Sequence, residues 1–339
     1  MKAAQFAKFG AVTRVVEVAE PSAPEAGEVT VAIEASPINP SDLVYIEGRY
    51  FRPVPLPFCP GSEAVACVIA RGSDVRHIDV GDRVIMLTVG NWTQQRTVPA
   101  SDVVKITAAA DPLQLAMLRV NPGTAWFLLE HAAMSAGDWL IQNAANSALA
   151  SLVIRFAREK GLRTVNLVRR REAVDAVVRA GGDVVLETGP DLPDRVQRAT
   201  GGAPIRLGLD AIAGDETGAM AACMAVGGVI ATYGMLSNEP CRISPHDLLA
   251  RELTLVGFRL RGARNSRSAQ TLHRFYNRLA QRLVAGETFT AVRASFPLEE
   301  IDAALREAAS GKPGKVLLLP NGTPEHSAAA MDVSDLESS

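Results

Sequence analysis

The chain has 339 residues, which is enough for about two domains of ordinary size. Hydrophobic residues make up 47% of the chain and charged residues 21%, a composition typical of a folded globular protein rather than of a disordered one. The formal net charge is −2, from 35 Lys and Arg against 37 Asp and Glu, so the chain has no overall field that would attract nucleic acid or an anionic membrane.

Motifs for metal, disulfide and membrane sites are missing from the sequence. The four cysteines form no CxxC pair, no HExxH motif occurs, and the five histidines are scattered. Neither a disulfide framework nor a zinc site is therefore predicted. No apolar run reaches the about 20 residues that a bilayer requires, and the first residues show neither a signal-peptide nor a transit-peptide pattern. These features predict a cytoplasmic protein that does not enter a membrane.

The first third of the chain is predicted to be β structure. Residues 28–35 alternate polar and apolar side chains, as in a half-buried strand, and residues 63–70 and 84–87 are further strands. Four prolines lie within residues 53–60. They predict a stiff loop, because proline fixes φ and lacks an N–H donor. This loop carries Tyr50 at its start and is a candidate wall for a pocket.

From residue 139 onward, strand and helix patterns alternate. Strands are predicted at residues 139–142, 164–168, 183–186, 206–211, 229–233 and 253–258, and helices at 147–160, 173–180 and 216–225. Alternation with nearly continuous apolar strands is typical of a parallel, doubly wound sheet. Two further helices, at 269–285 and 301–309, a strand at 315–319 and a disordered tail after Pro320 complete the prediction.

The turn after residues 139–142 is a candidate phosphate-binding turn, because a strand, a tight turn, a helix and a strand follow one another in about 30 residues. Ala145, Ser147 and Ala150 stand at the three glycine positions of a G-x-G-x-x-G pattern. Alanine at the third position still permits close packing of helix on strand, whereas serine at the second restricts the approach of the backbone. The free N–H groups of the helix N-terminus would favour a pyrophosphate. An αβ unit without a ligand remains the alternative.

Three arginines follow the next predicted strand. An NAD-selective site has an acidic residue about 20 residues after the turn, and this residue binds the ribose hydroxyls. Here the strand leads into Arg169, Arg170 and Arg171, whose guanidiniums suit the 2′-phosphate of NADP. A solvated start of a helix is the alternative, but cations at a helix N-terminus are unfavourable without a compensating anion.

Eight short segments, in this order and spacing, resemble the medium-chain dehydrogenase/reductase superfamily, and within it the mitochondrial-type trans-2-enoyl-thioester reductases. They are NPSD at 39–42, GRY at 48–50, PGSE at 60–63, GDRV at 81–84, VNPGTA at 120–125, QNA at 142–144, TYG at 232–234 and GF at 257–258. The resemblance covers about residues 1–320. It implies an α/β protein in which a Rossmann cofactor domain with a doubly wound parallel sheet, residues 122–258, interrupts a β-rich, GroES-like catalytic domain, residues 1–121 and 259–320; residues 321–339 would be a tail.

The resemblance also implies the chemistry. A hydride from NADPH would attack the β-carbon of an α,β-unsaturated thioester, and a proton would then reach the α-carbon. Tyr50 matches the catalytic tyrosine of the reductases, as a proton donor or as a hydrogen-bond donor to the thioester oxygen, since a phenol keeps its proton at neutral pH. The alternative for Tyr50 is a loop aromatic that packs on the prolines.

Cofactor contacts carried over from the resemblance lie in five places. Asn121 and Thr124 would lie near the nicotinamide; Asn146, Ser147, Ala148 and Leu149 would form the phosphate turn; Arg169, Arg170 and Arg171 would hold the 2′-phosphate; Tyr233, Gly234, Met235, Leu236, Phe258, Arg259 and Leu260 would line the nicotinamide and the cleft; and Lys315 would contact the cofactor. No metal is expected, because Asn39, Ser62 and Val120 stand at the positions that resemble the catalytic zinc ligands of the alcohol dehydrogenases, and none is a plausible zinc ligand.

Two departures from the reductase pattern concern ligand binding. Ala148 and Ala150 replace glycines of the phosphate turn, and their methyl groups are expected to weaken NADPH binding. The Gly-Phe-Trp-Leu run of the family has Arg259 in place of its tryptophan. We hypothesise that Arg259 selects an acceptor with a carboxylate or holds a cofactor phosphate.

Two alternatives to the enoyl-thioester reductase stay open. One is an NADPH-dependent reductase of free quinones or enones in the same superfamily, which needs no thioester pocket. The other is a catalytically silent paralogue that binds a nucleotide or a partner, which the glycine-free turn would favour. Nucleic-acid binding is not expected, because the basic residues are balanced overall. The resemblance implies a homodimer in which the cofactor sheets pair edge to edge.

Overall fold

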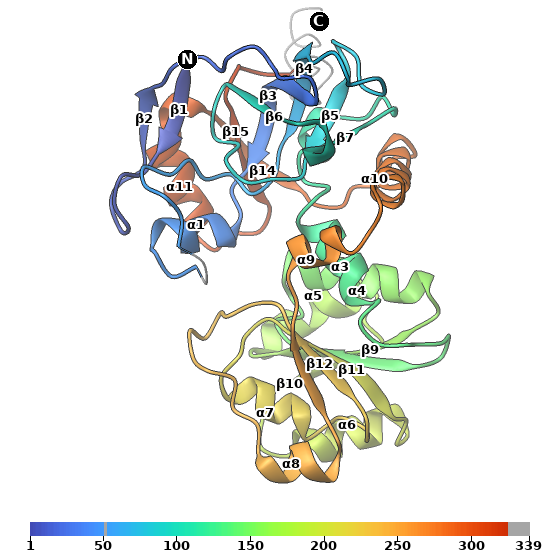
Figure 1. Ribbon diagram of the computed structural model, residues 1–339. Helices are drawn as coiled ribbons and strands as arrows, with labels where there is room; N and C mark the ends of the chain where they lie inside the picture. Colours follow the sequence, from blue (N-terminus) through green and yellow to red (C-terminus); the bar gives the residue numbers. More distant parts are fainter. Residues whose placement is uncertain (51–52, 325–339) are drawn as a thin grey trace, which may run out of the picture. The chain divides into compact units, whose positions relative to one another are not determined.

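The computed structural model describes residues 1–50 and 53–324 of the chain. The chain forms two compact units, which Figure 1 shows in the colours of the sequence. Unit 1 comprises Met1–Val120 and Arg267–Ser339, and unit 2 comprises Asn121–Ser266. Unit 2 is therefore inserted between two stretches of chain that build unit 1 together.

The boundaries differ slightly from the predicted ones. The sequence placed the second boundary after residue 258, whereas helix α9 (Leu260–Asn265) still belongs to unit 2, because it lies against α3 (Asn121–Leu128). At the start of the predicted tail, the Asn321 side-chain amide donates to the carbonyl oxygens of Ile33 and Gln94 at 2.9 Å each. The rest of that prediction, residues 325–339, lies outside the described residues.

Unit 1 is built on a seven-stranded sheet and a separate two-stranded sheet. The large sheet has the order β14-β15-β3-β4-β5-β7, with β6 paired to β3, and β1 pairs with β2 in the small one. The strands are β1 (Lys2–Gln5), β2 (Arg14–Glu17), β3 (Glu28–Pro37), β4 (Val65–Arg71), β5 (Arg83–Met86), β6 (Gln95–Pro99), β7 (Val103–Lys105), β14 (Val292–Pro297) and β15 (Lys315–Leu319). Because β15 pairs antiparallel with β3, the C-terminal part of the chain extends a sheet that the N-terminal part begins.

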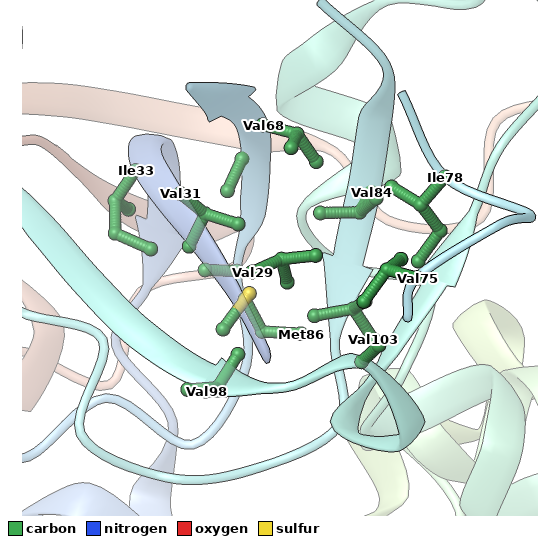
Figure 2. Packing of buried hydrophobic residues seen from close by; sticks show 13 residues of the cluster. Val29, Val31, Ile33, Val68, Val75, Ile78, Val84, Met86, Val98 and Val103 are labelled. Atoms are coloured by element: carbon green, nitrogen blue, oxygen red, sulfur yellow. The ribbon is translucent and has the colours of Figure 1, made fainter. Parts of the chain in front are cut away.

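The core of this sheet comes from the alternation that the sequence shows at residues 28–35. Val29, Val31 and Ile33 of β3 are fully buried on one face and pack with Val84 and Met86 of β5. Figure 2 shows these side chains gathered between the strands. The intervening polar residues of β3 leave this face, so the alternating strand buries one apolar surface, as its pattern predicts.

Among the residues that the structure describes, four α-helices belong to unit 1. They are α1 (Pro40–Ile46), α2 (Pro112–Leu115), α10 (Ala269–Val284) and α11 (Ile301–Ala309), together with the 3₁₀ turns η1 (Ala100–Asp102) and η3 (Leu298–Glu300). Helix α1 begins where it does because Asn39 caps it, Pro40 occupies its first turn, and the Asp42 carboxylate accepts the Asn39 backbone N–H at 2.8 Å.

Unit 2 contains a six-stranded sheet in the order β10-β9-β8-β11-β12-β13. Its strands are β8 (Trp139–Gln142), β9 (Arg163–Val168), β10 (Val184–Glu187), β11 (Ile205–Asp210), β12 (Val229–Thr232) and β13 (Thr254–Gly257). Every pairing is parallel, so all six strands end at the same edge of the sheet. The order reverses between β8 and β11, which confirms the predicted doubly wound sheet.

Helices connect the strands of unit 2. Besides α3 and α9 they are α4 (Ala148–Glu159), α5 (Val174–Arg179), α6 (Leu192–Thr200), α7 (Asp215–Ala221) and α8 (Pro245–Ala250), with the 3₁₀ turn η2 (Arg171–Ala173). Helix α4 buries Leu152, Val153 and Phe156, the apolar residues at helical spacing that predicted it. Within residues 1–50 and 53–324, no helix is both long enough and apolar enough to cross a bilayer.

Candidate active site

Four of the segments of unit 2 that were predicted to contact a cofactor follow the carboxyl ends of strands. The turn at residues 145–149 follows β8, Arg169 follows β9, residues 233–236 follow β12 and residues 258–260 follow β13. Because β9, β8, β11 and β12 are parallel neighbours, the structure brings these segments to one edge of the sheet. This edge, on both sides of the point where the strand order reverses, is where open α/β sheets bind ligands.

The glycine-free turn presents less bulk at the edge than its sequence suggests. The methyl groups of Ala145 and Ala150 are fully buried in the unit, so they do not occupy space above the turn. Ala148, at the first position of α4, is the exposed one of the substituted residues. The Ser147 hydroxyl caps α4 by accepting the Ala150 N–H at 3.2 Å, which leaves its own hydrogen available for another acceptor. The turn therefore keeps a free helix N-terminus that can meet an anion.

Arg169, Arg170 and Arg171 are exposed directly after β9. In the part of the chain that the structure describes, none of the three makes a side-chain hydrogen bond or an ion pair. Three unpaired cations after the second strand of the sheet are consistent with an anion-binding role.

The surroundings of Arg169 and Arg171 differ. Burial and the charge of Asp210 raise the pKa of Glu216 on α7, and the Arg169 guanidinium opposes this rise, so the positive charge of Arg169 acts on α7. Arg171 instead lines an open groove of about 700 Å³ together with Glu172, Asp175 and Glu187. The charge of Arg169 thus acts on a carboxyl of α7, whereas Arg171 lies among the carboxylates of the groove.

Asp210, at the end of β11, organises the edge although the sequence reading assigned it no role. Its carboxylate is fully buried. It accepts hydrogen bonds from the Asn143 amide and the Thr217 hydroxyl at 2.7 Å each, and from the backbone N–H groups of Ile212 and Ala213 at 2.9 Å each. These bonds tie the ends of β8 and β11 to α7. A charged residue that closes an apolar strand is the sequence signal that could have revealed it.

Residues 233–236 line the edge after β12. A Cβ atom on Gly234 would lie 2.4 Å from the Ala211 carbonyl oxygen, so only glycine permits this close approach of two chain segments. The Tyr233 hydroxyl is buried, and burial together with the charge of Asp210 raises its pKa. Met235 and Leu236 are exposed. Of the predicted cleft residues here, Met235 and Leu236 present apolar surface, whereas the Tyr233 hydroxyl is directed inward.

The remaining predicted residues of unit 2 lie on α3 and around α9. Asn121 and Thr124 form the first turn of α3, and Thr124 is buried. The ring of Phe258 is buried and meets His131 edge to face, with centroids 5.2 Å apart. Arg259 is exposed at the N-cap position of α9, without a capping bond from its side chain, and Leu260 is the first residue of that helix. Phe258 thus serves packing, while Arg259 presents a cation to the surface.

Tyr50 lies in unit 1, shortly after α1. Its ring stacks on that of Tyr45, with centroids 3.7 Å apart and planes at 24°. Burial raises the pKa of Tyr45 above its ordinary value, and the neighbouring Tyr50 hydroxyl adds to this rise. Glu47 and Arg49, on the loop between the two tyrosines, form an ion pair. The predicted catalytic phenol is therefore held by a second phenol that the sequence reading did not single out.

A buried polar cluster lies beside α1, at the positions that resemble zinc ligands in the alcohol dehydrogenases. The Asn39 amide donates to Glu63 at 3.0 Å and accepts a bond from the Lys315 ammonium. The Ser62 hydroxyl donates to Asp42 at 2.6 Å, and the Val120 backbone N–H donates to Glu63 at 2.6 Å. Residues 39, 62 and 120 are thus joined through two carboxylates.

The charges of this cluster are balanced in part by Lys315, which was predicted to contact the cofactor. Burial raises the pKa values of Asp42 and Glu63, and the Lys315 cation opposes both rises. Burial lowers the pKa of Lys315 itself. Lys315 therefore supplies positive charge next to two carboxyls, and its cofactor contact stays a prediction. Within residues 1–50 and 53–324, no three His, Cys, Asp or Glu side chains are grouped so that they could hold a metal ion.

Family comparisons agree with this architecture. Residues 25–108 match the alcohol dehydrogenase GroES-like domain, and residues 148–278 match the zinc-binding dehydrogenase family. The human mitochondrial enoyl-[acyl-carrier-protein] reductase is 32% identical over 323 residues, which cover 92% of this chain and 86% of that protein.

Solved structures show the same fold. A mycobacterial quinone oxidoreductase matches with a TM-score of 0.81 and 26% identity, over 94% of this chain and all of that one (100%). A mycobacterial protein solved in complex with NADPH matches with a TM-score of 0.80 and 27% identity, over 94% and 100% of the two chains.

The β-rich unit 1 and the parallel sheet of unit 2 therefore confirm the predicted GroES-like and Rossmann architecture. The residues at the zinc-ligand positions decide between the branches of the family, because the side chains of Asn39 and Ser62 bond to carboxylates and Val120 offers only an alkyl group. The chain belongs to the zinc-independent, quinone oxidoreductase-like branch of the medium-chain dehydrogenase/reductase superfamily, a family of nicotinamide-dependent oxidoreductases.

Proposed function

We propose that this protein uses NADPH to reduce the C2=C3 double bond of a 2-enoyl thioester. The observation that carries the proposal is the edge of the unit 2 sheet, where a free helix N-terminus and three unpaired arginines follow neighbouring strands. The substrate class is supported by the enoyl-[acyl-carrier-protein] reductase relatives, because 92% of this chain aligns with the human one.

The choice of NADPH over NADH rests on the residue that follows β9. A carboxylate at this position would bond the ribose hydroxyls of NAD and repel a 2′-phosphate. This chain has Arg169 here instead, followed by two further arginines. A guanidinium can donate two hydrogen bonds to a phosphate, so the exposed arginines favour the phosphorylated dinucleotide.

Phosphate-turn residues fit the same cofactor. The N–H groups of Ala148 and Leu149, at the first positions of α4, have no carbonyl partner within the helix and would meet the pyrophosphate. Because Ala150 turns its methyl group into the core, it does not block this approach. Of the two alanines that were expected to weaken NADPH binding, only Ala148 therefore presents its methyl group at the turn.

The bound dinucleotide would supply a hydride to the β-carbon of the substrate. The α-carbon of the resulting enolate then takes a proton from the Tyr50 hydroxyl: the O–H bond breaks, a C–H bond forms, and the electron pair of the O–H bond stays on the Tyr50 oxygen. Water returns a proton to Tyr50 after product release. A phenol suits this role because it holds its proton at neutral pH and becomes an anion when a stronger base forms beside it.

A panel of acceptors tests the proposal. NADPH oxidation would be followed with trans-2-enoyl-CoA thioesters of increasing chain length, with naphthoquinone and with simple enones. We expect the thioesters to react fastest. Faster turnover of naphthoquinone or enones would favour the quinone reductase alternative, which the similar quinone oxidoreductase structure supports. No turnover with any acceptor, while NADPH still binds in a titration, would favour a catalytically silent nucleotide-binding protein.

Substitution of Tyr50 tests the assigned acid. Tyr50→Phe removes the hydroxyl and keeps the ring, so turnover should fall by about 100-fold or more, the usual contribution of a general acid. The affinity for NADPH should barely change. Intact turnover combined with a large loss of NADPH affinity would show that Tyr50 serves the cofactor and not proton transfer.

Arg259 is a candidate for the residue that selects the acceptor. It stands where the reductases have a tryptophan, and it is exposed at the start of α9. We propose that it favours acceptors with a carboxylate. Adding anionic enoates to the panel, for the wild type and for Arg259→Trp, tests this role: an unchanged ranking of neutral and anionic acceptors would remove it.

We also propose a homodimer formed through β13. This strand is the last of the sheet order, so one of its edges has no neighbour within unit 2. Leu255 on β13 and Leu249 on α8 are 41% and 80% exposed, although both are large and apolar. A second copy that pairs with the same edge would cover them.

A further inference from the structure

Phe9 is the only exposed phenylalanine, tyrosine or tryptophan among residues 1–50 and 53–324, and 39% of its surface is accessible. Aromatic residues make up only 5% of the chain, and the other described ones are buried or half-buried. Removal of a large apolar side chain from water is favourable, so an exposed ring is a ready contact for an apolar ligand. What lies beside Phe9 decides which ligand this would be.

Phe9 lies against the loop that carries Tyr50. A Cβ atom on Gly48 would lie 2.8 Å from the Cβ and Cγ atoms of Phe9, so the Phe9 side chain packs directly on the Gly48 backbone. The Gly10 N–H also donates to the Ile46 carbonyl oxygen at 2.7 Å. Gly48 and Tyr50 are two residues apart, and two residues span at most about 7 Å. Phe9 therefore lies beside the stretch of backbone that positions the proposed proton donor.

A row of ring contacts also connects the two residues. The ring of Phe6 lies 5.9 Å from that of Phe9 and 5.7 Å from that of Phe58, between centroids. Phe58 in turn lies 5.3 Å from Tyr45, which stacks on Tyr50. Phe6 and Phe58 exchange two backbone hydrogen bonds of 3.0 Å each, which fix the N-terminal segment to the proline-rich loop. Phe9 and Tyr50 are thus the two ends of one connected row of five rings.

We propose that Phe9 is a specificity-determining residue, which contacts the acyl chain of the enoyl thioester and favours longer chains. This inference rests on the proposed function, in which Tyr50 gives its proton to the α-carbon. The acyl chain continues from the neighbouring β-carbon, so it must leave the reacting atoms close to Tyr50. Leu56, two residues before Phe58, is 40% exposed and adds a second apolar side chain in this part of unit 1.

A contact with Phe9 would depend on the length of the chain. A four-carbon enoyl group ends one carbon beyond the double bond, whereas a ten-carbon group continues much further. Each methylene group that is buried on binding strengthens it by about 3- to 4-fold. Because the distant part of the chain takes no part in the reaction, this contact is made equally in the ground state and the transition state. It would therefore act on KM rather than on kcat.

Phe9→Ser is the direct test, because it removes the ring at an exposed position. The value of kcat/KM would be measured with four-carbon and ten-carbon trans-2-enoyl-CoA. We expect the ratio of the ten-carbon to the four-carbon value to fall by about 10-fold, mainly through the KM of the longer substrate. Phe9→Leu keeps an apolar side chain and should keep most of the ratio. Val80→Ser, at a residue that is 62% exposed on the loop between β4 and β5, is the matched control and should leave the ratio unchanged.

Calorimetry gives a second measurement that needs no turnover. Butanoyl-CoA and decanoyl-CoA, the saturated four-carbon and ten-carbon thioesters, would be titrated into the protein in the presence of NADP⁺. We expect the wild type to bind decanoyl-CoA more tightly than butanoyl-CoA. In Phe9→Ser, the preference for decanoyl-CoA should be about 10-fold smaller.

The outcomes separate this inference from the proposed function. If the wild type reduces the thioesters and Phe9→Ser loses activity equally at both chain lengths, Phe9 only supports the loop and the inference is wrong. If the wild type reduces no thioester, the proposed function fails, and a calorimetric preference for decanoyl-CoA that is absent or independent of Phe9 contradicts the inference as well. If Phe9→Ser does not fold, Phe9→His, which keeps a ring with less apolar surface, must lower the ratio in its place; an unchanged ratio contradicts the inference.

Discussion

Arg169 and Arg171 are close in sequence and differ in surroundings. The charge of Arg169 acts on one carboxyl, that of Glu216 on α7, whereas Arg171 lines a groove with three carboxylates. A carboxylate beside a guanidinium competes with a bound phosphate for the same positive charge. The contribution to the 2′-phosphate should therefore be greater for Arg169 than for Arg171.

Arg169→Gln should weaken NADPH binding by about 10- to 100-fold, the range expected for the loss of a charge-assisted hydrogen bond. NADH binding should stay nearly unchanged, because NADH has no 2′-phosphate. Titration calorimetry with both dinucleotides measures the two constants. Arg179→Gln, at an exposed arginine of α5, is the matched control. Equal losses for NADPH and NADH would remove the 2′-phosphate assignment.

Among the functional residues, the sequence identified those whose amino-acid type is unusual for the position at which they stand. An arginine run after a strand and a tyrosine before a proline-rich loop are both visible without a structure. Asp210, Glu216 and Tyr45 were missed, because their importance depends on neighbours that are distant in sequence or that folding alone brings close. The Asn143 amide, for example, reaches the Asp210 carboxylate across 67 residues of chain.

At the scale of elements, the strands of unit 2 were predicted closely. Residues 139–142, 164–168 and 229–233 were expected, and β8, β9 and β12 end within one residue of these limits. The expected helix 216–225 is shorter, because α7 ends at Ala221 and the chain must turn before β12. Strands covered on both faces carry a continuous apolar signal, which explains the agreement.

Other elements had no such signal. Strands β1, β2, β6, β7 and β14 and helices α1, α2, α3, α6, α8 and α9 were not predicted. Most are short, and short elements depend on tertiary contacts more than on local pattern. The strand expected at 63–70 begins only at Val65, because the side chain of Glu63 belongs to the polar cluster.

The polar cluster links α1, β15 and the loop before β4. The balance of its charges predicts that the stability of the protein depends on pH. Lys315→Met keeps the volume of the side chain but removes the cation nearest to Asp42 and leaves Glu63 with only the smaller effect of Arg119. Removal of one partner from a buried charge cluster costs about 3 to 5 kcal/mol of unfolding free energy. This loss should appear in urea denaturation of the full chain near neutral pH.

The sign of the pH dependence follows from the raised pKa values of Asp42 and Glu63. Without Lys315 these values rise further, so the folded state binds more protons than the unfolded state above the ordinary carboxyl pKa, and stability falls as pH rises. The deficit should therefore be small near about pH 4 and large near about pH 8. Lys312→Met, at a lysine whose side chain is 65% exposed, is the control and should change stability little. An equal deficit at both pH values would contradict this account.

At the scale of the whole molecule, the exposed apolar residues near β13 predict the oligomeric state. In a two-fold symmetric dimer each interface residue occurs twice. Leu255→Lys would therefore place two charges, one from each copy, in the apolar contact. Light scattering on the purified protein should find a dimer for the wild type and a shift toward monomer for the variant. Val178→Lys, at an exposed apolar residue of α5, should remain dimeric. A monomeric wild type would contradict the proposed dimer.

The sequence by itself determined the type of each unit and the chemistry at the ends of its strands. Alternation at residues 28–35 predicted a half-buried strand, and the later strand–helix rhythm predicted a doubly wound sheet. The family resemblance marked positions 39, 62 and 120, whose residue types are no zinc ligands. These properties are local, because a residue pattern reports which side of its own element meets a core.

Only the tertiary structure decided which buried polar groups meet. Lys315 bonds to Asn39 across 276 residues of chain, and this contact exists because β15 pairs with β3 just before α1. The stack of Tyr45 and Tyr50 likewise depends on how the loop folds back onto α1. Hydrogen bonds and ring contacts of this kind depend on strand order and loop geometry, which no local pattern specifies, because apolar burial is non-directional whereas these contacts require particular partners.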